Sequence, residues 1–130
     1  MKTRFRSALS LALFWATSLQ AGDWPTWRGP NGNGLSSEKN VPLKWSATEN
    51  MVWKTPLDEP GNSSPIVAKG KVFVTQSLES GSRRCLMCFD RKTGEKLWQR
   101  ETPYAEKEPT HKTNPHCAAS PATDGKVIVA

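Results

Sequence analysis

The sequence predicts an all-β protein, and three features indicate this fold class. Short apolar runs rich in β-branched residues alternate with turn signals from Val41 onward. No stretch between residues 22 and 130 has the sustained 3.6-residue apolar period of a helix packed on a core. A unit made of a turn and its flanking strands also occurs twice in the chain, which is typical of folds assembled from repeated small sheets.

The first 21 residues have the layout of a secretory signal peptide. Met1 to Arg6 carries three basic side chains, Ser7 to Ala16 is almost wholly apolar, and small or polar residues lead to Ala21. The alternative is a buried N-terminal helix. The apolar run is shorter than the about 20 residues that a membrane-spanning helix needs. We therefore expect an exported protein, periplasmic or extracellular, with no membrane span after signal cleavage.

The positive charge of the chain does not indicate a nucleic-acid partner. The whole sequence carries a net charge of +6, of which the three basic residues before the apolar run supply half. The remaining Lys and Arg residues are scattered singly, apart from Arg83-Arg84 and Arg91-Lys92, and each of these pairs lies beside a turn. A nucleic-acid binder usually shows a dense basic stripe instead. We expect a protein or cell-envelope partner, no nucleic acid and no oligomer.

Residues 22–50 predict an irregular segment. Pro and Gly are dense from Gly22 to Gly34, which excludes a helix and disfavours the interior of a strand. Trp24 and Trp27 lie within this stretch, and indole rings are costly to leave in water. We expect both tryptophans to pack against the domain. The alternative is that they stack on a sugar or another ligand.

Residues 51–130 contain the expected sheet. The first strand has β-forming residues and stops at a proline, Pro56. The second and third flank a Lys69-Gly70 turn and predict a hairpin. The expected strands are Met51–Thr55, Pro65–Ala68, Lys71–Thr75, Arg84–Phe89 and Lys96–Arg100.

The turn between the last two strands is the most informative feature of the sequence. It reads Asp-x-x-Thr-Gly and is followed, four residues after the glycine, by Trp98. The Asp90 carboxylate can accept hydrogen bonds from backbone groups across such a turn, and Gly94 can adopt a positive φ without steric cost. The pattern predicts a β-hairpin with a large aromatic side chain on its outgoing strand.

This segment resembles the tryptophan-docking motif of the quinoprotein-type, or PQQ-like, β-propellers. Asp90, Thr93, Gly94 and Trp98 match the motif, and Cys88 replaces its first residue, alanine. The opening Asp-Trp-Pro-x-Trp-Arg-Gly-Pro-Asn-Gly is also similar to the start of many exported PQQ-like repeat proteins. The resemblance implies a propeller of four-stranded antiparallel blades, in which the motif joins neighbouring blades and has a structural role.

An internal repeat indicates how many blades the chain contains. Ser64–Val74 aligns with Ser120–Val129, with the serines 56 positions apart and the glycines of the turns 55 apart. Trp53 and Trp98 are a second repeated feature, at a spacing of 45 residues. Propeller blades repeat every 40 to 50 residues or so, and a polar insertion at 101–119 lengthens the period here. We expect one blade and the start of the next, about one and a half blades, from an N-terminal fragment of a longer protein.

Cys85-Leu86-Met87-Cys88 forms a C-x-x-C motif with several interpretations. A c-type haem site would need a histidine at the next position, where Phe89 stands. A zinc site would need further ligands, which His116-Cys117 or His111 could supply. Residues i and i+3 of a strand face opposite sides, which disfavours a shared site. We expect two packed thiols, with Cys88 in the small motif position. The alternatives are a disulfide from Cys117 and a metal site.

The long insertion supplies weak candidates for a binding site. His111, Asn114 and His116 lie within it, and long loops on rigid β scaffolds often carry binding residues. Neutral imidazole can bind a metal or act as an acid and base near pH 7. No Asp or Glu lies at a spacing from these histidines that would indicate a catalytic or metal-binding motif, so we favour a solvated loop.

We expect no catalytic, cofactor-binding or metal-binding residues in this chain. Quinoprotein dehydrogenases of the resembled family use a disulfide between adjacent cysteines, calcium ligands and a catalytic aspartate, and no segment matches these positions. The favoured function is therefore a non-catalytic binding or scaffolding module. The alternatives are an N-terminal fragment of a dehydrogenase that uses PQQ with calcium, and a carbohydrate- or peptide-binding domain.

Overall fold

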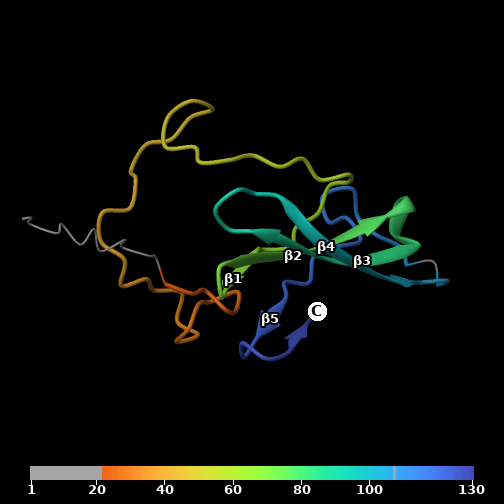
Figure 1. Cartoon of the computed structure of the whole chain (residues 1–130). Helices are drawn as coiled ribbons and strands as arrows, with labels where there is room; N and C mark the ends of the chain where they lie inside the picture. The colour runs from red at the N-terminus through yellow and green to blue at the C-terminus, as the bar shows by residue number, and fades with distance from the viewer. Residues whose placement is uncertain (1–21, 107) are drawn as a thin grey trace, which may run out of the picture.

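The protein is all-β, as the sequence predicts. The computed structural model describes residues 22–106 and 108–130, so the predicted signal peptide lies outside the described residues. Four antiparallel strands form one sheet in the order β1-β2-β3-β4 (Figure 1). The strands are β1 (Ile66–Ala68), β2 (Lys71–Leu78), β3 (Arg83–Asp90) and β4 (Lys96–Pro103). This up-and-down sheet is the four-stranded antiparallel blade that the PQQ-like fold class implies.

Local turn chemistry explains two of the three connections. Lys69 and Gly70 have φ values of 49° and 71°, the double positive φ of the tight turn that suits a two-residue hairpin. The pairing then places Ile66 opposite Phe73. A short 3₁₀ turn, η1 (Glu79–Gly81), joins β2 to β3. The predicted Asp-x-x-Thr-Gly turn joins β3 to β4.

The two faces of the sheet bury separate sets of side chains. One face holds a cluster formed by Val74, Leu78, Cys85, Met87 and Phe89. The opposite face holds Ile66, Ala68, Phe73 and Cys88, with Leu86, Trp98 and Ile128 packed against them. This alternation follows from the two-residue period of a strand. The second cluster already includes a residue from beyond the sheet, so this face is the one that meets the next repeat.

The second repeat begins a further sheet beside β1. Strands β5 (Ala122–Thr123) and β6 (Ile128–Val129) pair antiparallel, with Thr123 opposite Ile128. In Figure 1 this blue hairpin lies beside the β1 end of the blade. The sequence repeat is thus a structural repeat, and the start of a second blade follows the first.

The predicted first strand is not found. Met51–Thr55 belongs to no ladder, because no described strand runs beside it. The strands β2 and β4 are also longer than expected and continue through polar residues to Leu78 and Pro103. The insertion therefore starts after Pro103 rather than after Arg100. The predicted domain boundary at residue 51 stays a prediction.

The prediction that both N-terminal tryptophans pack is half wrong. Trp24 is partly buried and lies over Gly29, where an added Cβ would come within 2.7 Å of the ring. Trp27 is 67% exposed. Gly29 has a φ of 76°, which allows the backbone to approach the Trp24 ring closely. Within residues 22–106 and 108–130, no helix is long and apolar enough to cross a bilayer.

Candidate functional site

The Asp90 carboxylate holds the docking turn together. Its Oδ1 accepts hydrogen bonds from the backbone N–H of Lys92 at 2.8 Å, the N–H of Thr93 at 2.9 Å and the Thr93 hydroxyl at 3.3 Å. The bonds from the Thr93 and Lys92 backbone lower the pKa of Asp90 below its ordinary value, because they favour the ionised form. This carboxylate therefore fixes the backbone conformation of the turn.

Backbone hydrogen bonds complete the same turn. The Gly94 N–H donates to the Asp90 carbonyl oxygen at 2.9 Å, and the Asp90 N–H donates to the Glu95 carbonyl oxygen at 2.9 Å. Gly94 has a φ of 73° and is buried. A bulge follows, since Cys88 pairs with Trp98 whereas Phe89 pairs with Lys96. The extra residue brings Trp98 opposite the small Cys88.

Trp53 docks on this turn from the segment before the blade. Its indole Nε1 donates to the Arg91 carbonyl oxygen at 2.9 Å, and the Thr55 hydroxyl donates to the Gly94 carbonyl oxygen at 2.7 Å. A Cβ added to Gly94 would lie 2.5 Å from the Trp53 ring. The ring thus lies directly on the glycine. Sequence reasoning missed this contact. The signal for it was the 45-residue spacing between Trp53 and Trp98, which suggests that Trp53 is a docking tryptophan as well.

Trp98 occupies the position in the sheet that corresponds to the motif tryptophan. The side chain is half-buried; its ring centroid lies 6.0 Å from that of Phe73, and the Arg100 guanidinium lies 5.7 Å from it. Cys88 beneath it is fully buried, so the thiol fills the small position of the motif. Burial of Trp98 against a following blade stays a prediction.

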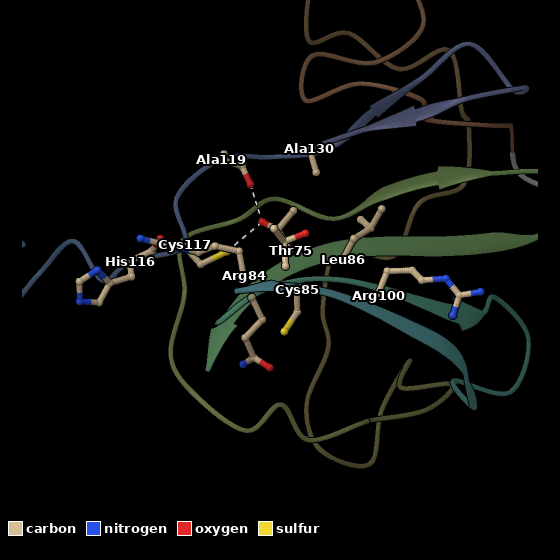
Figure 2. A pocket seen from close by; sticks show the side chains of 11 residues that line it. Thr75, Arg84, Cys85, Leu86, Arg100, His116, Cys117, Ala119 and Ala130 are labelled. Carbon is tan, nitrogen blue, oxygen red and sulfur yellow. Dashed lines mark hydrogen bonds between the residues drawn. The ribbon is translucent and has the colours of Figure 1, made fainter. Parts of the chain in front are cut away.

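A cavity of about 430 Å³ lies where the insertion returns to the blade (Figure 2). The Cys117 thiol donates to the Thr75 hydroxyl at 3.1 Å, and this hydroxyl donates to the Ala119 carbonyl oxygen at 2.5 Å. Arg84, Arg100 and His116 also line the cavity. The hydrogen-bond chain attaches the insertion to β2, whereas two buried atoms of lining residues, Gln76 Oε1 and His116 Nδ1, have no hydrogen-bond partner among the described residues.

The C-x-x-C cysteines do not share a site. Cys85 belongs to the cluster on one face of the sheet and Cys88 to the cluster on the other, as the strand period predicts. All three cysteines are unpaired, so the disulfide alternative with Cys117 is wrong. Burial raises the pKa of the Cys85 and Cys88 thiols. In Figure 2 the Cys85 and Cys117 side chains point to different sides of the strands.

The loop candidates are not brought together. His111 and Asn114 are exposed; the His111 Nδ1 contacts the Thr113 hydroxyl at 2.8 Å, and the Asn114 Oδ1 accepts from Asn62 at 3.4 Å. His116 instead packs its ring against Gly81, where an added Cβ would come within 2.6 Å. Nothing in this arrangement gives the three residues a common ligand.

Arg84 organises the insertion, and sequence reasoning missed this role. Its guanidinium donates to the Glu108 carboxylate at 2.7 Å and to the His116 carbonyl oxygen, and lies 4.6 Å from the centre of the Tyr104 ring. The Tyr104 hydroxyl donates to the same carboxylate at 2.8 Å. The bonds from Tyr104 and Arg84 lower the pKa of Glu108. This set of contacts fastens the insertion to β3.

The described residues do not fit the quinone cofactor with calcium. No two of the three cysteines are adjacent in the sequence. Within residues 22–106 and 108–130, no three His, Cys, Asp or Glu side chains gather in a way that could hold a metal ion. Asp90 is engaged by its own turn. The zinc alternative likewise lacks a common location for its ligands.

A comparison with protein families identifies the repeat family. The sequence model of the family described as outer membrane protein assembly factor BamB, a family of PQQ-type repeats, matches residues 12–130. No curated protein and no solved structure matches the chain. The matched range covers the docking turn, both repeats and the N-terminal segment that contains Trp24.

Proposed function

This chain belongs to the family described as outer membrane protein assembly factor BamB, and we propose that it is an exported, non-catalytic scaffold that binds a protein partner. The partner would be a protein of the cell envelope, since the description of the family names the outer membrane. Family membership supports the propeller architecture directly. The binding role rests on a further observation on the surface.

Large apolar side chains are exposed along one arm of the protein, which we define as residues 35–57. The arm has no strand or helix and runs around the blade before it reaches β1 (Figure 1). Its exposed large apolar residues are Leu35, Val41, Leu43, Trp45, Met51, Val52 and Leu57. Soluble proteins rarely display so many in one segment unless the surface meets another molecule. This observation carries the proposal of a protein partner.

The polar groups support a scaffold rather than an enzyme. The Asp90 carboxylate accepts three hydrogen bonds within its own turn, and Glu108 is held by Arg84 and Tyr104. A general base needs a carboxylate or imidazole directed at substrate. For the carbohydrate- or peptide-binding alternative, only Trp27 of the two N-terminal tryptophans offers an exposed ring.

Site-specific photo-crosslinking in cells tests the proposal. A crosslinking residue at Leu43, which is 89% exposed, should capture one defined envelope protein that mass spectrometry identifies. The matched position is Lys92, an exposed residue of the docking turn, and it should not give this product. The substitution Trp45→Ser, made together with the crosslinker at Leu43, should weaken the product. Capture of cytoplasmic proteins only, or equal capture from both positions, would reject the proposal.

A further inference from the structure

The N-terminal segment makes strand-like contacts with the open edge of the blade. The Trp24 N–H donates to the Val67 carbonyl oxygen at 2.7 Å, and the Val67 N–H donates back to the Trp24 carbonyl oxygen at 2.9 Å. This exchange is an antiparallel bridge on the side of β1 that β2 leaves free. We call residues 23–26 the inner strap. The strap thus adds to the sheet edge as a one-residue strand.

The ends of the strap are fixed by two further groups. Both oxygens of the Asp23 carboxylate accept from the Lys69 N–H, at 3.2 and 3.1 Å, so the carboxylate binds the hairpin turn at its first positive-φ residue. Pro25 follows the paired Trp24, so in an extended segment its backbone groups face away from β1. Its carbonyl oxygen instead accepts from the Thr123 N–H of β5 at 2.9 Å. The strap therefore touches both blades.

The contacts between the blades show which edge the strap covers. The Ser64 N–H donates to the Ser120 hydroxyl at 2.9 Å, and the Lys69 ammonium donates to the Gly125 carbonyl oxygen. Both contacts join residues next to β1 with residues next to β5, the first strands of their repeats. Blades of a propeller radiate from a central channel, so they converge at the strands nearest the axis. The free edge of β1 therefore faces the channel.

We propose that this channel-facing edge is a strand-addition site for an extended peptide, which the protein occupies with its own residues 23–26. The ligand carries an aspartate whose carboxylate accepts from the Lys69 N–H. The next residue pairs with Val67 of β1, and a proline follows whose carbonyl oxygen accepts from β5 of the next blade. Edge pairing of this kind is a recognised mode of peptide binding. While residues 23–26 occupy this edge, other ligands cannot bind to the channel wall beside β1 and β5.

Hydrogen exchange in the full chain tests the site. In Asp23→Ala the strap should detach more often, so the amides of Val67, Lys69 and Thr123, which bond to three successive strap residues, should exchange together about fivefold to tenfold faster. The amides of the β2–β3 ladder should keep their rates. The control Asp58→Ala alters an exposed aspartate outside the strap. Unchanged rates at Val67 and Thr123, or an equal rise throughout the sheet, would overturn the proposal.

Two additional measurements test pairing and exchange. The pair Trp24→Cys with Val67→Cys should form a disulfide, since residues of a bonded antiparallel pair have Cα atoms about 5.5 Å apart. The control pair Trp27→Cys with Val67→Cys should not. A synthetic peptide of residues 22–28 should slow exchange at Val67 in Asp23→Ala, whereas the same peptide with Asn for Asp should act weakly. If Trp24→Cys with Val67→Cys forms no disulfide, or if both peptides slow exchange at Val67 equally, the strand-addition site is rejected.

Discussion

The backbone N–H of Ser64 donates to the hydroxyl of Ser120 at 2.9 Å, and these two serines occupy the same position in the two repeats. Residues that are one sequence period of 56 residues apart are therefore also in direct contact. The two corresponding turns also meet, through the Lys69 ammonium and the Gly125 carbonyl oxygen. Because equivalent residues meet, the same bond can connect each blade to its successor.

The first prediction concerns the glycine under Trp53. We expect Gly94→Ala to lower the free energy of unfolding by about 2–4 kcal/mol, since it adds the cost of a positive φ to a close contact with the ring. Gly70→Ala is the matched control: its φ is 71°, but an added Cβ meets nothing within 4 Å. That variant should lose only about 1 kcal/mol. Chemical denaturation measures both values, and equal losses would contradict the contact.

A double variant separates the ring from the backbone. In a Trp53→Ala background, the additional cost of Gly94→Ala should shrink to the cost of Gly70→Ala, because the ring that the new methyl group meets is gone. Costs that remain additive would show that the two residues do not interact.

The second prediction concerns acid stability. The pKa of Asp90 is lowered from 3.8 in the folded protein, so its ionised form stabilises the fold fully above that value. This contribution is lost as the pH falls below 3.8 and through the folded-state pKa. Asp90→Asn should lower the Tm at pH 7 and reduce the fall of Tm between pH 4 and lower values. Asp58→Asn serves as the control. A steeper acid transition in Asp90→Asn would refute the assignment.

The third prediction concerns thiol reactivity. Burial raises the pKa of Cys85 and Cys88, so little thiolate is present at pH 8 and alkylation should be slow. Mass spectrometry after iodoacetamide treatment should show these two cysteines unmodified in the native protein and modified in denaturant. All three thiols should survive mild oxidation without an internal disulfide. A crosslink between Cys85 and Cys88 would contradict their placement on opposite faces.

The fourth prediction concerns Trp98. We expect Trp98→Ala to cost about 3 kcal/mol, the lower end for aromatic truncation, because the ring is half-buried in this chain. The neighbouring Leu97→Ala should cost about 0.5 kcal/mol, as at other exposed positions. Urea unfolding compares the two variants. Similar costs would indicate that Trp98 contributes nothing beyond its neighbour.

The fifth prediction concerns the cofactor. Addition of pyrroloquinoline quinone and calcium to the purified chain should give no saturable change in tryptophan fluorescence and no dye-linked alcohol oxidation. The described residues offer neither an adjacent cysteine pair nor a gathered set of metal ligands. Saturable binding that requires calcium would favour the dehydrogenase alternative over the scaffold.

The parts of the fold that local chemistry fixes were predictable from sequence. Lys69-Gly70 and Asp90–Gly94 specify turns through positive φ and a self-bonding carboxylate, so both hairpins occur where expected. The two-residue period likewise placed Cys85 and Cys88 on opposite faces. These features need no knowledge of distant residues.

The features that depend on distant partners were not predictable. Met51–Thr55 has the composition of a strand, yet a strand requires a neighbour, and its side chains dock on a turn about 40 residues away instead. Arg84 meets Glu108 through an insertion without periodicity. Trp27 looks like a packing residue in the sequence, but its side chain is exposed in the folded chain.

The contact between Trp53 and Gly94 has a consequence for biosynthesis. The tryptophan emerges first, and the glycine that receives it follows 41 residues later (94 − 53). A nascent chain therefore cannot settle this ring until the hairpin downstream has closed. If each tryptophan can dock only after the next turn has formed, the blades fold one after another from the N-terminus to the C-terminus. Interrupted synthesis would then leave the latest tryptophan exposed, a natural signal for chaperones and proteases.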